Sequence, residues 1–209
     1  MPKKTAPLEI APKTQELPDI VRYGDLAIAR IDVRDVVKRS AELLGGRIPS
    51  LVVADPPWLY RGGIGGWSTR DLYGEMDCNG IRDVLADAYS FAQADAYHVL
   101  WTTFPFIEEW VLASKNGGRW PWVYKNGGIW SKTGGMGLGY HGRSMGEPWF
   151  LYTKGAPHPK RLNFGTIVEG PEGQSITADK STRTRKPLHL AIAHVETYSD
   201  PGTLVLDYW

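Results

Sequence analysis

Hydrophobic residues follow two alternating patterns along this chain. Short continuous apolar runs, each stopped by polar residues or proline, are typical of buried strands. Apolar residues at helical spacing, such as Ile81, Val84 and Leu85, predict amphipathic helices. The predicted strands cover residues 26–31, 51–54, 97–101, 121–131, 148–153 and 203–206, and the predicted helices cover residues 34–44, 79–91, 106–115 and 187–198. Because strands alternate with helices, the pattern predicts an α/β fold with a mostly parallel sheet and helices on both faces.

The segments between these elements give the expected domain organisation. Residues 1–20 hold four prolines and show no hydrophobic periodicity, so we expect a flexible N-terminal tail there and a single domain over residues 21–209. Asn79 is the expected N-cap of the second helix. Residues 155–185 are polar and rich in Gly, Ser and Thr, which predicts a long loop.

Composition and charge narrow the class of protein. The chain has 209 residues, 42% of them apolar and 22% charged, which is enough for one domain with a sizeable core. The formal net charge of +1 excludes a polybasic binder, so any nucleic-acid footprint must be local. Cys78 is the only cysteine, which excludes a disulfide framework and a cysteine cluster for zinc.

Two further absences bear on the compartment. No apolar run approaches the roughly 18 residues of a membrane span, and Lys3 and Lys4 are not followed by the apolar segment of a secretory signal. We therefore expect a cytoplasmic protein with no membrane partner, located in the host cytoplasm if a phage encodes it.

The loop after the second predicted strand carries the candidate chemistry. Asp55, Pro56, Pro57 and Trp58 directly follow the apolar run at residues 51–54. Ligands of open α/β sheets bind beyond the carboxyl ends of the strands, and two prolines make the backbone there rigid. The Asp55 carboxylate and the Pro56 carbonyl would accept the two hydrogens of an aromatic amine, while Trp58 would stack on the ring. This positioning suits methylation of the N6 amine of adenine, whose lone pair is otherwise delocalised. The alternative is that Asp-Pro-Pro is only a turn.

Two other features of the sequence favour structural explanations, and a third leaves two explanations open. Residues 137–142 fit the pattern Gly-x-Gly-x-x-Gly, but no clear strand leads in and no clear helix follows, so we expect a target-side loop instead of a dinucleotide site. The five histidines lack metal-ligand spacing, and no metal is expected. Lys180, Arg183 and Arg185 form a basic stretch that would either be a solvated loop or grip phosphates.

The order of motifs along the chain resembles a known family. Over most of residues 50–207 the sequence is similar to the Asp-Pro-Pro-Trp adenine-N6 methyltransferases, the family of the catalytic subunit that methylates eukaryotic mRNA and of its bacterial and phage relatives. The matching motifs are residues 55–58, 73–76, 100–103, 130–132 and 137–140, Arg143, Glu147, residues 154–155 and 185–187, and Asp207.

This resemblance implies a Rossmann-like methyltransferase sheet with circularly permuted motif order, S-adenosyl-L-methionine as the cofactor, and nucleic acid as the substrate. It implies that the catalytic residues are Asp55, Pro56, Pro57 and Trp58. The cofactor-binding residues that it implies are Asp32, Val33, Asp55, Lys186 and Asp207. The implied substrate-binding residues are Trp58, Tyr73, Arg143 and Glu147.

One departure from the family concerns the last strand. In the family, the strand that ends near Asp207 lies in the middle of the sheet and continues into a loop around the methionine part of the cofactor. This sequence ends at Trp209, so we expect a domain cut short at its C-terminus that binds the cofactor weakly and methylates slowly.

The sequence therefore predicts transfer of a methyl group to the N6 amine of adenine. DNA is favoured over RNA because a compact chain without added RNA-binding modules resembles the bacterial and phage members. A homodimer or a heterodimer is compatible with this function. The alternative is a catalytically impaired methyltransferase-like protein that binds nucleic acid or scaffolds a partner.

Overall fold

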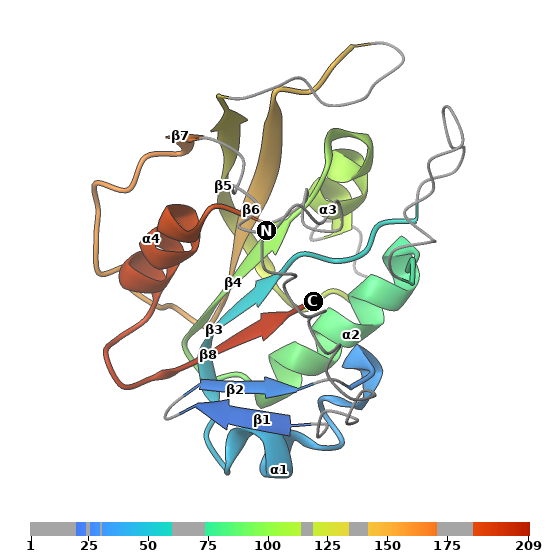
Figure 1. Cartoon of the computed structure of the whole chain (residues 1–209), viewed down its shortest axis with the longest axis vertical. Helices are drawn as coiled ribbons and strands as arrows, with labels where there is room; N and C mark the ends of the chain where they lie inside the picture. The colour runs from blue at the N-terminus through green and yellow to red at the C-terminus, as the bar shows by residue number, and fades with distance from the viewer. Residues whose placement is uncertain are drawn as a thin grey trace, which may run out of the picture.

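The computed structural model describes residues 20–23, 26–29, 31–59, 74–113, 119–133, 142–170 and 186–209. Its centre is a six-stranded sheet with the strand order β7-β5-β6-β4-β3-β8 (Figure 1). The strands are β3 (Pro49–Ala54), β4 (Ala96–Trp101), β5 (Val123–Lys132), β6 (Gly146–Lys154), β7 (Ile167–Gly170) and β8 (Leu204–Tyr208). Five of these six strands run in one direction, and only β6 is antiparallel to its neighbours. The mostly parallel α/β sheet that the sequence predicts is confirmed.

Helices cover both faces of this sheet, as Figure 1 shows with α2 on one side and α4 on the other. On the first face, α2 (Cys78–Phe91) and α3 (Ile107–Ala113) pack on the even-numbered residues of β3 and β4, including Val52, Ala54 and Leu100. On the second face, α4 (Leu188–Tyr198) buries Leu190 against the odd-numbered residues of the same strands. Successive side chains of a strand point to opposite faces, so each strand contributes to both halves of the core.

The N-terminal region differs from the prediction. β1 (Ile20–Tyr23) and β2 (Leu26–Ala29) form a separate antiparallel hairpin, so the run at residues 26–31 does not join the main sheet. The helix expected at residues 34–44 is divided into a 3-10 turn at Val33–Asp35 and the short helix α1 (Ser40–Leu44). Asp32 caps the 3-10 turn, because its carboxylate accepts a hydrogen bond from the backbone N–H of Arg34 at 2.9 Å. The predicted tail at residues 1–20 lies outside the described residues except for Ile20.

Two local predictions are corrected by the structure. The N-cap of α2 is Asp77 and not Asn79, because the Asp77 side chain accepts the backbone N–H of Gly80 at 2.8 Å. The segment predicted as a loop at residues 155–185 contains β7, whose four residues pair in parallel with the end of β5. β7 is too short for its hydrophobic pattern to reveal it.

The expectation that the strand ending at Asp207 lies in the middle of the sheet is wrong for the described residues. β8 pairs with β3 alone and forms one edge of the six-stranded sheet. No other described segment pairs with its outer side, since the hairpin of β1 and β2 forms its own sheet.

Candidate active site at the carboxyl edge of the sheet

The candidate site is built where the parallel strands end. Asp55 follows β3, and its backbone N–H donates to the carbonyl of Tyr208 at 3.3 Å, which extends the pairing of β3 with β8. In that pairing Asp207 lies beside Val53, and Val53 is two residues before Asp55 in the chain. Because side chains two residues apart in a strand share a face, both carboxylates belong to the face that α4 covers.

Four charged side chains at this edge form an ion-pair network, which consists of Asp55, Lys186, Glu147 and Lys132. The ammonium group of Lys186 lies 2.6 Å from Asp55 Oδ2 and 3.0 Å from Glu147 Oε2. The other oxygen of Glu147, Oε1, lies 2.5 Å from the ammonium group of Lys132. Positive and negative charges therefore alternate along the network. The side chains of Lys132 and Lys186 keep only 13% and 17% of their surface exposed, whereas that of Asp55 keeps 34%. Asp55 is thus the most accessible member.

Each member of the network comes from a different element. Lys186 precedes α4, Glu147 is near the start of β6, and Lys132 ends β5. Trp130 lies opposite Glu147 in the hairpin of β5 and β6, which brings Lys132, two residues further on, to the same face as Glu147. Aromatic rings support both ammonium groups: Lys186 lies 5.2 Å from the ring of Trp101, and Lys132 lies 5.0 Å from that of Trp130.

The electrostatics of the site favour an ionised lysine between two carboxylates. Burial lowers the pKa of Lys186, but Asp55 and Glu147 outweigh it and leave that pKa above its ordinary value. Burial raises the pKa of Glu147, but Lys186 and Lys132 reverse the shift. The pKa of Asp55 stays raised, because burial and the charge of Glu147 outweigh the two lysines. Burial and the nearby charge of Asp55 raise the pKa of Asp207 to about 6, against the opposing charge of Lys186. Asp207 adds one carboxylate to a network of two lysines and two carboxylates, and a cationic ligand would stabilise the ionised form of both Asp55 and Asp207.

The Asp-Pro-Pro-Trp loop is fixed to the core at its far end. Trp58 is 6% exposed; its ring stacks on Phe106 at 5.2 Å and meets the edge of Trp110 at 5.7 Å. The carbonyl of Pro57 accepts the backbone N–H of Met76 at 2.8 Å, whereas no described residue donates to the carbonyl of Pro56. Burial of the Trp58 ring disfavours the predicted stacking on a base, and it supports a role in holding the loop.

Three other predicted site residues that the structure describes, Asp32, Val33 and Arg143, make no described contact with the ion-pair network. Asp32 is engaged by Arg34, which donates to the carboxylate from both its backbone and its side chain and lowers the pKa of Asp32 to about 2. Val33 packs at the margin of the core on the α2 face. Arg143 is exposed, and no described contact connects it to Asp55. Tyr73 lies outside the described residues. Their roles stay predictions.

Sequence reasoning missed two residues of the site. Lys132 is part of the motif at residues 130–132, but it received no role, and Trp101 was expected only as part of a strand. Neither the burial of the Lys132 ammonium group nor its partner could be found from local sequence, because Glu147 is 15 positions away and the pairing depends on the hairpin register.

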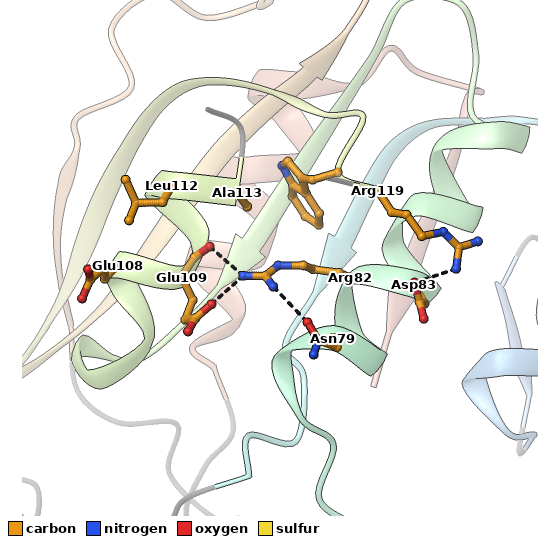
Figure 2. A pocket seen from close by; sticks show the side chains of 9 residues that line it. Asn79, Arg82, Asp83, Glu108, Glu109, Leu112, Ala113 and Arg119 are labelled. Atoms are coloured by element: carbon orange, nitrogen blue, oxygen red, sulfur yellow. Dashed lines mark hydrogen bonds and ion pairs between the residues drawn. The ribbon is translucent and has the colours of Figure 1, made fainter. Parts of the chain in front are cut away.

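The hollow in Figure 2 is separate from this site. It has a volume of about 650 Å³ and lies between α2 and α3, with Arg82, Glu109 and Trp120 in its wall. Arg82 lies 2.6 Å from Glu109, and Arg119 lies 2.9 Å from Asp83. The charged residues in the wall of the hollow are therefore largely paired with one another. None of its lining residues belongs to the ion-pair network. A pocket on the α2 face cannot serve the carboxylates on the α4 face.

Within the described ranges, no group of three or more His, Cys, Asp and Glu side chains is arranged to hold a metal ion. In the same part of the chain, no helix has the length and apolar character needed to cross a membrane.

Comparison with known proteins identifies the fold. No family model matches the chain, and no curated protein matches it. Solved structures that are similar to it include two of M1.HpyAVI. M1.HpyAVI in its complex with SAM is 15% identical, with a TM-score of 0.57 over 85% of this chain and 78% of that chain. A second structure of M1.HpyAVI is 14% identical, with a TM-score of 0.56 over 86% of this chain and 78% of that chain. At this level of identity the likeness establishes the fold, and the Rossmann-like methyltransferase sheet expected from the sequence is confirmed.

Proposed function

We infer that this chain transfers a methyl group from S-adenosylmethionine to the N6 amine of adenine in nucleic acid, with DNA favoured over RNA. The observation that carries the inference is the position of Asp55. Its partly exposed carboxylate stands at the carboxyl edge of the sheet, next to a Pro56 carbonyl that no described residue engages. Two acceptors side by side on a rigid loop match the two N–H donors of one exocyclic amine.

The residues present suit the cofactor. When bound, S-adenosylmethionine supplies a methyl group on a positively charged sulfur. Burial raises the pKa of both Asp55 and Asp207, and the charge of Asp55 adds to the shift at Asp207, so a cationic ligand would stabilise the ionised form of both carboxylates. Lys186 is the cation at the same edge that would pair with the carboxylate of the cofactor. M1.HpyAVI, which shares the fold, has been solved in complex with SAM, and this supports the assignment.

The chemistry asked of the protein is positioning. Asp55 and the Pro56 carbonyl would hold both hydrogens of the amine and draw its nitrogen towards a geometry in which the lone pair is available. Glu147 and Arg143 would lie on the side of the target base. A base inside a duplex must leave the stack to reach such an edge, so flipping is part of this proposal. The preference for DNA follows the resemblance of the sequence to bacterial and phage relatives.

A second candidate is a nucleic-acid-binding or scaffolding protein with impaired catalysis. The observation that favours it is the ion pair of Asp55 with Lys186, because Lys186 occupies the carboxylate that the target amine would need. For catalysis, the target amine must bind Asp55 Oδ1, or Lys186 must move away and free Oδ2. A scaffolding protein needs neither.

One assay separates the two candidates. The protein is incubated with labelled S-adenosylmethionine and with oligonucleotides of duplex DNA, single-stranded DNA or RNA, which are then digested to nucleosides and analysed by mass spectrometry. The enzyme predicts N6-methylated adenine, with a higher yield from DNA. Matched oligonucleotides in which purine, without the 6-amino group, replaces adenine should gain no label. Cofactor binding by calorimetry without any transfer would favour the second candidate, and a methyl group found on another base would overturn the adenine assignment.

A further inference from the structure

Lys132 is the most buried charged side chain of the ion-pair network, although it does not touch Asp55. Three ion pairs in series connect them: Lys132 pairs with Oε1 of Glu147, Glu147 pairs with Lys186 through Oε2, and Lys186 pairs with Asp55. Lys186 in turn lies 2.6 Å from Asp55, closer than its 3.0 Å to Glu147. The shared lysine therefore lies nearer to the candidate catalytic carboxylate than to its competitor.

We propose that Lys132 is a positioning residue for Asp55: by neutralising Glu147, it leaves the ammonium group of Lys186 to the catalytic carboxylate. This rests on the function proposed above, which it deepens by adding a residue that acts at a distance. Without Lys132, Glu147 would be a carboxylate with a single cationic partner in the network, and it would draw Lys186 away from Asp55.

The charge balance of the network supports this role. Two lysines and two carboxylates give a net charge of zero when Lys132 is present, and of −1 when a neutral side chain replaces it. The described charged groups that act on Asp55 are Lys186, Glu147 and Lys132, and its charge in turn acts on Asp207. Of these, Lys186 and Lys132 lower the pKa of Asp55, while Glu147 raises it. Loss of Lys132 thus makes Asp55 harder to ionise, both directly and through the movement of Lys186 towards Glu147.

The test compares substitutions that predict opposite shifts. Lys132→Met should raise the pKa of the Asp55 carboxyl group, and Lys132→Arg, which keeps the charge, should restore it to the value of the wild-type protein. Glu147→Gln removes the competitor for Lys186 and should lower the pKa of Asp55. General loosening of the structure would not give shifts of opposite sign. Carbon-13 NMR of the Asp55 side chain, followed over a pH titration of the full chain, measures all of them.

Lys154→Met is the matched control. Lys154 is also a half-buried strand lysine over an aromatic ring, with its ammonium group 4.6 Å from the ring of Tyr89 and hydrogen-bonded to the carbonyls of Tyr89 and Ala92. It is the last residue of β6, at the other end of that strand from Glu147 and outside the network. Its substitution removes comparable packing and should leave the pKa of Asp55 unchanged.

Methyl transfer gives the second measurement. Lys132→Met should lower kcat by about tenfold or more, within the ~10²-fold that a misplacement of about 1 Å costs, and it should move the acidic limb of the pH profile to higher pH. Lys132→Arg should keep most of the rate, and Lys154→Met should keep the position of the acidic limb.

The outcomes distinguish this proposal from the proposed function. An Asp55 pKa that is the same in folded Lys132→Met and wild type overturns the positioning role, even if the wild type methylates adenine. A shifted pKa in a protein that transfers no methyl group supports the coupling and overturns the function. If circular dichroism shows that Lys132→Met is unfolded, Glu147→Gln decides: a lowered pKa supports the proposal, and an unchanged or raised pKa contradicts it.

Discussion

Lys186 lies between two carboxylates in the described site, and this placement decides how each of them behaves. Glu147 has two cationic partners and its pKa falls, whereas Asp55 shares one of them and its pKa stays raised. Asp207 has no described ion-pair partner, and burial together with the charge of Asp55 raises its pKa to about 6. Lys186 therefore contacts both Glu147 and Asp55, but only the pKa of Glu147 falls below its ordinary value.

Asp207→Asn should stabilise the protein at pH 8. The pKa of Asp207 in the folded chain is about 6, above its ordinary value of 3.8, so the folded state holds this proton more tightly than the unfolded state does. The contribution of Asp207 to stability is therefore greatest below pH 3.8 and is lost as the pH rises through about 6. Because Asp207 keeps part of its surface in contact with solvent, screening limits the expected gain to about 1 kcal/mol or less.

Urea denaturation of Asp207→Asn and wild type at pH 8 and pH 4 measures this effect. The difference in the free energy of unfolding should be positive at pH 8 and shrink at pH 4. The prediction would be wrong if the variant were less stable than the wild type at pH 8, or if the difference were the same at pH 8 and pH 4. Either result would show that burial and the charge of Asp55 do not disfavour ionised Asp207.

At the scale of elements, the central strands and long helices could be predicted because their patterns are continuous. The apolar run at residues 51–54 lies in β3, and the periodic residues Ile81, Val84 and Leu85 form the buried face of α2. β7 could not be predicted, since Ile167 is exposed and the strand exists through its pairing with β5. The position of Asp55 after β3 was predictable from the sequence, whereas the burial of Trp58 was not, because it depends on Phe106 in a distant turn.

The Asp-Pro-Pro-Trp loop gives a prediction at this scale. If Trp58 anchors the loop in the core, Trp58→Ala should lower the free energy of unfolding by about 3–5 kcal/mol, the usual cost of deleting a buried aromatic ring. Trp58→Phe keeps an apolar ring on Phe106 and should lose less. Equilibrium unfolding in urea checks both variants. A loss below about 1 kcal/mol for Trp58→Ala would place the ring outside the core and restore its predicted role in base stacking.

At the scale of the whole molecule, the alternation of side chains in the sheet assembles the site. Asp55 and Asp207 share one face with Trp101 and Trp130, and Lys186 arrives there because α4 covers that face. The sequence indicated which strands exist, but not that β6 lies between β4 and β5, which places Glu147 between the two lysines. Strand order depends on contacts between segments far apart in the chain, so the Lys132 end of the network could not be predicted from local patterns.

The same strand order predicts a gradient of local stability. β3 and β4 are paired on both sides and buried, whereas β7 and β8 form the two edges of the sheet. Backbone amides of residues 50–54 and 96–101 should therefore exchange with solvent more slowly than those of residues 167–170 and 204–208. Hydrogen-exchange mass spectrometry measures this directly. Protection of β8 equal to that of β3 would mean that another segment pairs with its outer edge.

The role of Asp55 is the central claim, and the rate of methyl transfer by Asp55→Ala tests it most directly. Initial rates are measured with labelled S-adenosylmethionine and adenine-containing DNA, alongside circular dichroism to verify that the variant is folded. Loss of an acceptor that positions the reacting amine should cost at least about 10²-fold in kcat. We predict a loss of this size in a folded protein. A folded Asp55→Ala that works within about tenfold of the wild-type rate would contradict the account.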